Sequence, residues 1–373
     1  MNRKSFLQLT ALALAMLPGA LYAADNSWNR GAVYTMDNST NGNNVLLFRR
    51  AGDGSLTPAG SFPTGGSGTS SGLANQGGVL LSRDGRWLFV CNAGSHEISV
   101  FAVTPNGLLL TEKVASEGRR PVSLTLHRNL LYVLNAGGAA GAHDNITAFL
   151  FAFGKLTHCP GSTRALSADN TGPAEIAFTR NGDVLVVTEK ATGVIDTFTV
   201  GDDGLVDDHK MFASPVPTPF GFAVGGADRI FVSEAKGGAA DAGSVSSYEV
   251  SNDGDLAAIS SAVPTTETAA CWVVLTRDER YAYASNTGSG TLSAYRVGPD
   301  GSLQLLNSDG ITGTTGAGSK PIDLALSRDS RYLYSLNSGN GTITAFRVEA
   351  NGSLQALPGL SGLPADANGL AAR

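Results

Sequence analysis

Clusters of basic residues are missing from this sequence, and charged residues of either sign are scarce. Charged side chains make up 16% of the 373 residues, and the formal net charge is −6. Beyond the N-terminal segment, no basic run is longer than Arg119-Arg120. Nucleic acids and anionic membrane surfaces are bound by clustered lysine and arginine side chains. We therefore expect no nucleic-acid partner.

Cysteine is rare, with only Cys91, Cys159 and Cys271 in the chain. An oxidising compartment permits a disulfide, but an odd number leaves at least one thiol unpaired. The alternative is that all three are small packing residues. Neither a C-x-x-C pair nor the histidine-rich spacing of a metal site occurs. We expect no cofactor and no resident metal.

Long apolar runs are absent except near the N-terminus, where the run from Phe6 to Leu17 is too short to span a bilayer. Arg3 and Lys4 precede this run, and a small residue, Ala23, follows it. Residues 1–23 therefore read as a secretory signal peptide that is cleaved near Ala23. We expect a mature protein without membrane insertion, in a bacterial periplasm or outside the cell.

Two short matches to catalytic motifs lack the context that their chemistry requires. Gly68–Gly72 fits G-x-S-x-G, but it lies in a Gly/Ser loop with no strand before it and no helix after it. Gly313–Lys320 resembles a phosphate-binding loop, but Pro321 follows it and prevents the required helix from forming. Both are interpreted as loop composition.

Glycine, in contrast, is abundant at 47 residues, and much of it marks a turn that recurs about every 50 residues. The turns contain Asp53-Gly54, Asn106-Gly107, Gly154, Asp203-Gly204, Asp253-Gly254, Asp300-Gly301 and Asn351-Gly352. A strand-like run precedes each turn, at 45–48, 98–101, 146–149, 195–198, 245–248, 292–295 and 343–346. An earlier run recurs at 32–35, 87–90, 131–134, 184–187, 230–233, 281–284 and 332–335.

This spacing predicts four short antiparallel strands per repeat and seven repeats, because the turns leave no room for helices. We therefore predict an all-β fold, a seven-bladed β-propeller that forms one domain over residues 24–373. The first blade lacks an inner strand before Ala32, whereas Asn368–Ala372 at the far end resembles one. We expect this C-terminal segment to complete the N-terminal blade and close the ring.

A polar residue ends each second strand, on the side where the long loops emerge: Asp37, Asn92, Asn135, Glu189, Glu234, Asn286 and Asn337. Asn and Asp favour such positions because their side chains hydrogen-bond nearby backbone. Glutamate has no such preference, so Glu189 and Glu234 stand out, and Lys190 and Lys236 follow them closely. The glutamates are either an acid and a base or members of surface ion pairs.

The predicted inner strands begin with Gln76, Pro121, Glu175, Phe220, Trp272 and Asp323. Trp272 and Phe220 are expected to floor a pocket into which Glu175 and Asp323 point, or else these large residues simply fill the channel. A third interpretation places Ca²⁺ among Glu175, Asp323, Asn135 and Asn286, because oxygen ligands suit that ion.

The repeats combine Ser82–Arg86 (Ser-Arg-Asp-Gly-Arg), an aromatic-rich strand, Asn92–Gly94 (Asn-Ala-Gly) and Ile98–Phe101 (Ile-Ser-Val-Phe). In these motifs the sequence resembles the seven-bladed propeller lactonases, a family that includes 6-phosphogluconolactonases and carboxymuconate-lactonising enzymes. The resemblance covers nearly all of the mature chain. It implies metal-free lactone hydrolysis by a few His, Arg and Glu residues on one face.

The family's basic residues are replaced at the matching positions. Its Gly-Pro-Arg-His segment corresponds to Gly172–Glu175, which reads Gly-Pro-Ala-Glu, and its Pro-Arg-Gly segment corresponds to about residues 270–272, which lack the arginine. The glutamate that ends the second strand is matched by Glu189. Without the basic clamp, a phosphorylated or polycarboxylate lactone is not the expected substrate.

Two functions are therefore predicted. The first is hydrolysis of a neutral or weakly charged lactone or ester, with Glu189 as general base, Glu234 or Lys190 assisting proton transfer, and further contacts from other residues. These substrate contacts are assigned to Trp272, Phe220, Glu175, Asp323, Asn135, Asn286, Asn337 and Asn92. The alternative is a non-catalytic scaffold that binds a peptide, a glycan or another cell-envelope ligand through the same face. Under both functions we expect a monomer.

Overall fold

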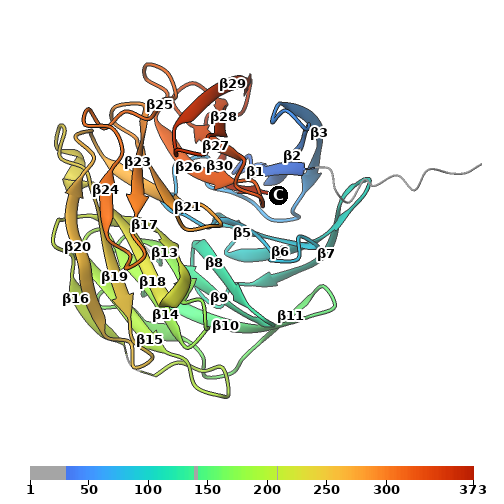
Figure 1. The fold of residues 1–373 in the computed structure, drawn as a ribbon. Coiled ribbons are helices and arrows are strands. Elements are labelled where there is room, and N and C mark those ends of the chain that lie inside the picture. The colour runs from blue at the N-terminus through green and yellow to red at the C-terminus, as the bar shows by residue number, and fades with distance from the viewer. Residues whose placement is uncertain (1–30, 138–141, 208) are drawn as a thin grey trace, which may run out of the picture.

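The computed structural model describes residues 31–137, 142–207 and 209–373, so the expected signal peptide lies outside the described residues. Seven antiparallel sheets are arranged around a central axis, as predicted (Figure 1). Each sheet is one blade, numbered here from the N-terminal blade. The strands of a blade run outward from the axis in chain order, except that the inner strand of blade 1 comes from the C-terminus.

The first four blades hold the following strands. Blade 1 contains β30 (Asn368–Ala372), β1 (Gly31–Met36), β2 (Asn44–Arg50) and β3 (Leu56–Pro63). Blade 2 contains β4 (Val79–Leu81), β5 (Trp87–Asn92), β6 (Glu97–Thr104) and β7 (Gly107–Ala115). Blade 3 contains β8 (Pro121–His127), β9 (Leu130–Asn135), β10 (Asn145–Ala152), β11 (Lys155–His158) and the short β12 (Arg164–Ala165). Blade 4 contains β13 (Pro173–Phe178), β14 (Val184–Glu189), β15 (Val194–Thr199) and β16 (Lys210–Ala213).

The last three blades follow the same plan. Blade 5 contains β17 (Pro219–Val224), β18 (Arg229–Glu234), β19 (Ser244–Val250) and β20 (Leu256–Pro264), with single 3-10 turns at Gly226–Asp228 and Lys236–Gly238. Blade 6 contains β21 (Ala270–Leu275), β22 (Tyr281–Asn286), β23 (Thr291–Val297), β24 (Leu303–Leu305) and the short β25 (Gly313–Thr314). Blade 7 contains β26 (Pro321–Leu326), β27 (Tyr332–Asn337), β28 (Thr342–Val348) and β29 (Leu354–Ser361).

The second strands are buried on both faces because each blade is packed between two others. Every residue of β14, β22 and β27 is buried, whereas the outermost strand β29 is mostly exposed. Between blades 4 and 5, for example, Val186 and Ile195 share an apolar cluster with Phe222 and Val232. A strand buried on both faces loses the apolar–polar alternation of a one-sided sheet. This explains why the second strands read as continuous apolar runs.

The ring closes as predicted. Strand β30 pairs with β1 of blade 1 and not with a strand of blade 7, which precedes it in the sequence. Ala32 and Arg373 exchange two backbone hydrogen bonds, and the hydroxyl of Thr35 donates to the carbonyl of Asn368 at 3.2 Å. Closure pairs the inner edge of β1, which would otherwise be exposed. The strand pairing also supports the predicted register of blade 1: Val33 lies opposite Phe48 as Leu88 lies opposite Phe101, so Asp37 corresponds to Asn92.

The remaining expectations concern cysteines and helices. Cys91, Cys159 and Cys271 are all free thiols, and Cys91 and Cys271 are buried. The interpretation as packing residues is therefore confirmed for these two. In the part of the chain that the structure describes, no helix is long and apolar enough to cross a membrane.

Candidate functional site

We call the two ends of the ring the loop face and the turn face. The loop face is where inner strands begin and second strands end, and the turn face carries the short turns between them. In five blades the residue just before the inner strand has a φ between 51° and 68°. Its carbonyl accepts a hydrogen bond from the backbone amide of the residue just after the second strand of the same blade. The pairs are Arg120 with Ala136, Gly172 with Lys190, Thr218 with Ala235, Ala269 with Thr287, and Lys320 with Ser338. This repeated bond stabilises the left-handed backbone, which is costly for a residue with a side chain.

Lys190 lies half-buried on the loop face, directly after β14. Its Nζ donates to the carbonyls of Ala74 at 2.7 Å and Pro173 at 3.0 Å, and lies 4.8 Å from the centroid of the Phe220 ring. Burial lowers the pKa of Lys190 to about 7, and the nearby charge of Arg120 is a smaller lowering cause. A lysine with a pKa near 7 is present in both protonation states at neutral pH, so it can accept and return a proton.

Two aromatic side chains form a wall beside Lys190. The rings of Phe220 and Trp272 are 4.8 Å apart between centroids and tilted by 54°, and both residues are buried. The indole N–H of Trp272 donates to the carbonyl of Asn75 at 2.8 Å. The structure therefore brings Lys190, Phe220 and Trp272 together. The segment Ala74–Asn75, in the crossing from blade 1 to blade 2, accepts hydrogen bonds from Lys190 and Trp272.

The same crossing closes the channel just below this cluster. Gln76 begins near β4, yet its side-chain amide donates to the carbonyl of Val273 in blade 6 at 3.0 Å and accepts from the amide of the same residue at 3.2 Å. Its backbone amide donates to Ala174 in blade 4 at 3.0 Å. A Cβ on Gly221 would collide with the Gln76 side chain, so blade 5 approaches it closely too. Gln76, just before β4 of blade 2, thus crosses the axis and contacts blades 4, 5 and 6, and we refer to it as the plug of the channel.

Glu175 and Asp323 are both buried near the axis, next to this plug. Glu175 accepts from the amide of Phe222 at 2.6 Å, and Asp323 accepts from the amide of Leu324 at 2.8 Å. Burial raises the pKa of both carboxyl groups, and the charge of Asp323 raises the pKa of Glu175 further. A carboxyl group with a raised pKa ionises less readily, so burial weakens the attraction of this pair for a cation.

The described residues contain no group of three or more His, Cys, Asp or Glu side chains that could hold a metal ion. Asn135 and Asn286, which the calcium interpretation placed beside Glu175 and Asp323, belong to blades 3 and 6. Each of them donates its side-chain amide within its own blade or to a neighbouring loop. The structure does not bring the four predicted oxygen ligands together through any shared contact among its described residues.

Glu189 is fully buried at the end of β14. Its carboxylate accepts from the amide of Ser167 at 3.0 Å, from the Ser167 hydroxyl, and from the hydroxyl of Thr192 at 2.5 Å. Asp196 lies beside it, also fully buried, and burial together with the Glu189 carboxylate raises the pKa of Asp196 to about 9. Blade 4 therefore contains a carboxylic acid next to a carboxylate.

Glu234 occupies the equivalent position in blade 5, but in a different setting. Its Oε2 accepts from the hydroxyl of Ser244 at 2.6 Å, and burial raises its pKa to about 7. Its charge contributes to raising the pKa of Tyr248 and of Tyr295. The two glutamates share no hydrogen-bond partner among the described residues, and neither forms an ion pair there, so the interpretation as surface ion pairs with Lys190 and Lys236 is wrong.

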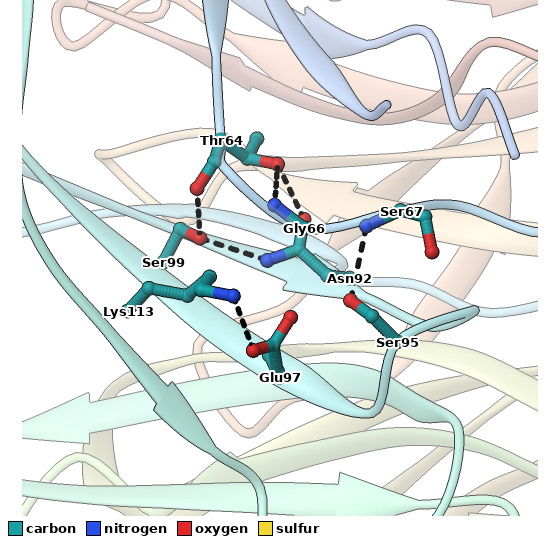
Figure 2. Close-up of polar contacts among 8 residues, drawn as sticks. All are labelled: Thr64, Gly66, Ser67, Asn92, Ser95, Glu97, Ser99 and Lys113. Carbon is teal, nitrogen blue, oxygen red and sulfur yellow. Dashed lines mark hydrogen bonds and ion pairs between the residues drawn. The ribbon is translucent and has the colours of Figure 1, made fainter. Parts of the chain in front are cut away.

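The four asparagines at the ends of second strands form internal networks. Asn92 donates to the hydroxyl of Ser99 at 2.8 Å and accepts from the hydroxyl of Thr64 at 2.7 Å, and Ser99 in turn donates to the carbonyl of Thr64 (Figure 2). The other three repeat this bridge to the third strand: Asn135 to Asn145, Asn286 to Ser293, and Asn337 to Thr344. Their observed role is structural, and their predicted role in substrate binding stays a prediction.

Two residues of this region escaped the sequence analysis. Asp196 stands seven residues after Glu189, where Asn92, Asn286 and Asn337 are followed by a serine or threonine at the same distance. An acidic residue at a position that holds a hydroxyl residue in three other blades could have indicated a carboxyl pair in blade 4. Arg120 was not recognised either: its Nε is buried without a hydrogen-bond partner among the described residues, and its charge reaches Lys190. Its position immediately before Pro121 was the only hint.

Comparison with known proteins gives a family match over most of the chain. Residues 41–160 and 229–361 match the sequence profile of the family described as "Lactonase, 7-bladed beta-propeller". The interval between the matched segments contains Lys190, Glu189 and Phe220, whereas Ala74, Gln76 and Trp272 lie within the matched segments. A search of curated proteins gave no match.

Solved structures with the same fold include several bacterial proteins. A putative 6-phosphogluconolactonase from Bacteroides uniformis has 16% identity and a TM-score of 0.71, covering 91% of this chain and 98% of its own. A periplasmic gluconolactonase from Pseudomonas aeruginosa has 15% identity and a TM-score of 0.70, with coverage of 91% and 98%. A protein from Lactobacillus plantarum has 16% identity and a TM-score of 0.72, with coverage of 92% and 99%. At these identities the likeness establishes the fold.

Proposed function

Because this chain belongs to the lactonase family of seven-bladed β-propellers, we propose that it hydrolyses a neutral or weakly charged lactone on the loop face, with Lys190 as the proton-transfer residue. The observation that carries this proposal is the position of the Lys190 amine, which is half-buried against Phe220 with a pKa of about 7. Two named members of the same fold, the putative 6-phosphogluconolactonase and the periplasmic gluconolactonase, place lactones among the substrates to test first.

The hydrogen bonds of Lys190 suit a base. A neutral amine has two N–H donors and one lone pair, and the carbonyls of Ala74 and Pro173 take both donors. The lone pair is then the position left for a proton from an attacking water. The water oxygen forms a bond to the lactone carbonyl carbon while its proton passes to Lys190. The ring C–O bond then breaks, and the departing alkoxide takes that proton back as the hydroxyl of the product.

Two neighbours support this chemistry in the proposal. We assign Arg120, whose charge acts on Lys190, to stabilising the negative charge that develops on the lactone oxygen in the transition state. Glu189, predicted from the sequence as the base, has its oxygens occupied by Ser167 and Thr192. We therefore assign Glu189 to positioning, because it fixes the end of β14 from which Lys190 extends. The proposed mechanism assigns no proton transfer to Glu234.

The test is hydrolysis of glucono-δ-lactone and 6-phosphogluconolactone by the purified mature chain and by Lys190→Met. A general base typically contributes about 100-fold or more, so we expect kcat/KM to fall by about that factor. The wild-type rate should rise with pH around an apparent pKa near 7, since the neutral amine is the active form, and this rise should vanish in the variant. Lys236→Met is the matched control, because Lys236 is exposed near the equivalent position of blade 5.

Glu189→Gln separates positioning from base catalysis. If Glu189 positions Lys190, the variant should lose activity but keep the pH dependence near 7. Full activity in Lys190→Met, with the pH rise lost in Glu189→Gln instead, would return the role of base to Glu189. No turnover of any lactone by the wild-type chain would reject the hydrolase.

A second candidate function is a non-catalytic binding scaffold for a peptide, glycan or other envelope ligand. One observation favours it: Lys190 and Trp272 already hold the chain's own carbonyls at Ala74 and Asn75, and Gln76 closes the channel below them. Absence of lactone turnover together with binding of envelope glycans or peptides would support it. In either case we propose export across the cytoplasmic membrane, and a mature protein that retains residues 1–23 would contradict this.

A further inference from the structure

A repeated arginine on the turn face has no part in the function proposed above. The turn between the first and second strands carries it in five blades, as Arg83, Arg128, Arg180, Arg277 and Arg328. Since equivalent turns of a propeller lie at the same end of the ring, the five residues share the face opposite Lys190. The sequence motif is Ser-Arg-Asp in blades 2 and 7 and Thr-Arg-Asp in blade 6.

The turn itself uses the residues on either side of the arginine. In blade 2 the Ser82 hydroxyl donates to Asp84 at 2.6 Å and accepts from the amide of Trp87 at 3.0 Å. In blade 7 Ser327 makes the same two bonds, to Asp329 at 2.7 Å and from Tyr332 at 3.0 Å. Blade 6 repeats the pattern with a threonine. The turn therefore requires the hydroxyl and the aspartate, while the arginine between them is left without a structural explanation.

The arginines converge on a cavity at the end of the channel. A cavity of about 600 Å³ is lined by six arginines and two aspartates: Arg50, Arg83, Arg86, Arg277, Arg328, Arg373, Asp84 and Asp329. An adjoining cavity of about 490 Å³ shares Arg83, Arg277 and Arg328 and adds Arg180, which is paired with Glu279 at 2.5 Å. The six arginines and two aspartates of the larger cavity leave a formal excess of four positive charges, in a chain whose net charge is −6.

Most of this positive charge is not neutralised by ion pairs. Among the described residues, Arg83, Arg277 and Arg328 form no side-chain hydrogen bond and no ion pair, whereas Asp84 is taken by Arg86 at 2.7 Å. The Nε of Arg373 is buried without a partner in the described structure. Cavities lined by one sign of charge focus the electrostatic field and concentrate counter-ions. Arginines from blades 1, 2, 6 and 7 surround this one, so a matching ligand needs more than one anionic group.

We propose that this arginine-lined cavity on the turn face binds a small polyanion that carries two or more phosphate or carboxylate groups. An arginine guanidinium forms two parallel hydrogen bonds with a phosphate or a carboxylate group, whereas a lysine ammonium acts only as a point charge. The cavity volume admits a ligand of small-molecule size. The site is separate from Lys190, so its failure and the failure of the lactonase proposal are distinguishable.

The test is calorimetric titration of the purified full chain with inorganic tripolyphosphate, with citrate and, as a monovalent control, with acetate. We expect saturable binding of tripolyphosphate or citrate at 20 mM salt, weaker binding at 150 mM salt, and no saturable binding of acetate. The stronger of the two polyanions identifies phosphate or carboxylate as the preferred group. If neither binds at low salt, the proposal is overturned.

The paired variant Arg83→Gln with Arg328→Gln should weaken polyanion binding at least tenfold. Arg128→Gln is the matched control, because Arg128 occupies the same turn in blade 3 but lines neither cavity, and its affinity should stay within about twofold of wild type. Since these side chains are exposed, the fold should survive, which thermal unfolding without ligand verifies. Equal weakening in the control and in the paired variant would mean diffuse charge attraction and would overturn the site. Lactone turnover should be unchanged in all three proteins.

Discussion

At the scale of single residues, blade 4 is distinguished by two acids buried side by side. Where blades 2, 6 and 7 hydrogen-bond an asparagine to a hydroxyl, blade 4 has Glu189 beside Asp196. Two adjacent buried carboxyl groups disfavour being charged together, so one is held in its neutral form. The hydrogen bonds from Ser167 and Thr192 go to Glu189, which leaves Asp196 as the member that keeps a proton.

We predict that Asp196→Asn makes the protein less sensitive to alkaline pH. The folded-state pKa of Asp196 is about 9, against an ordinary value of 3.8. The folded form thus holds a proton that the unfolded form has released, so the stabilising contribution is complete below about pH 4 and is lost as pH rises through about 9. Between pH 5 and 8 the free energy of unfolding should fall more steeply in wild type than in the variant, by up to about 1 kcal/mol per pH unit.

The measurement is denaturant unfolding at pH 5, 6.5 and 8. Asn matches the neutral carboxylic acid in shape, so the two curves should lie close together at pH 5 and separate at pH 8. Asp202→Asn serves as the control, because Asp202 is exposed on a turn. Parallel pH dependence of wild type and Asp196→Asn would show that Asp196 is ionised in the folded protein.

At the scale of elements, the blades are joined by tyrosines that reach the hairpin turn of the next blade. The hydroxyls of Tyr332 and Tyr334 in β27 donate to the carbonyls of Gly52 and Gly54 in blade 1, at 2.5 and 2.8 Å. Tyr283 in β22 makes the same bond to Gly352 in blade 7 at 2.9 Å. The hairpin glycine is needed twice, for its positive φ and because the tyrosine ring packs directly against it.

We predict that Tyr334→Phe lowers the free energy of unfolding by about 1 kcal/mol, because it leaves the buried carbonyl of Gly54 without its donor. Gly54→Ala should cost more, since its φ is +90° and the added Cβ would collide with the Tyr332 ring. Gly362→Ala is the control for backbone strain alone, with a φ of +86° and no atom within 4 Å of the added Cβ. Equal losses in the two glycine variants, measured by denaturant unfolding, would show that the ring contact contributes nothing.

At the scale of the whole molecule, the ring depends on one short strand from the C-terminus. Strand β30 pairs with β1, and Leu370 and Ala367 pack in a cluster with Val33 of blade 1 and Tyr334 of blade 7. Among the described strands, only β30 joins a blade whose other strands lie more than 300 residues earlier in the sequence. Its removal would expose the edge of β1 and the side of blade 7 together.

We predict that a chain ending at residue 364 unfolds about 5 to 10 °C below the full chain, well beyond what the loss of nine surface residues would cause. The matched rescue is a permuted chain in which residues 365–373 precede Gly31 through a short linker. This connection is feasible because Ala372 pairs with Val33 in the antiparallel register, so the two ends lie together. Melting followed by circular dichroism provides the comparison. An unchanged melting temperature in the truncated chain would mean that β30 does not close the ring.

The sequence by itself determined the architecture because its signals are local. Each Asp-Gly or Asn-Gly turn requires a positive φ within a few residues, and each blade repeats the same order of strands, so the seven sheets and even the role of Asn368–Ala372 could be predicted. The Glu189–Asp196 pair also had a local signal, seven residues apart, although it was not recognised.

Only the tertiary structure decided which of the predicted residues meet. Lys190 lies 116 residues from Ala74, and Gln76 lies 197 residues from Val273, and no periodicity specifies such contacts across the ring. Glu189 and Glu234 looked equivalent in sequence, yet burial and different partners separate them. The turn-face arginines likewise read as separate turns until closure placed four blades around one cavity. Local turns determine where each strand of a blade begins and ends. The candidate site instead depends on how the closed ring brings loops that are distant in sequence together.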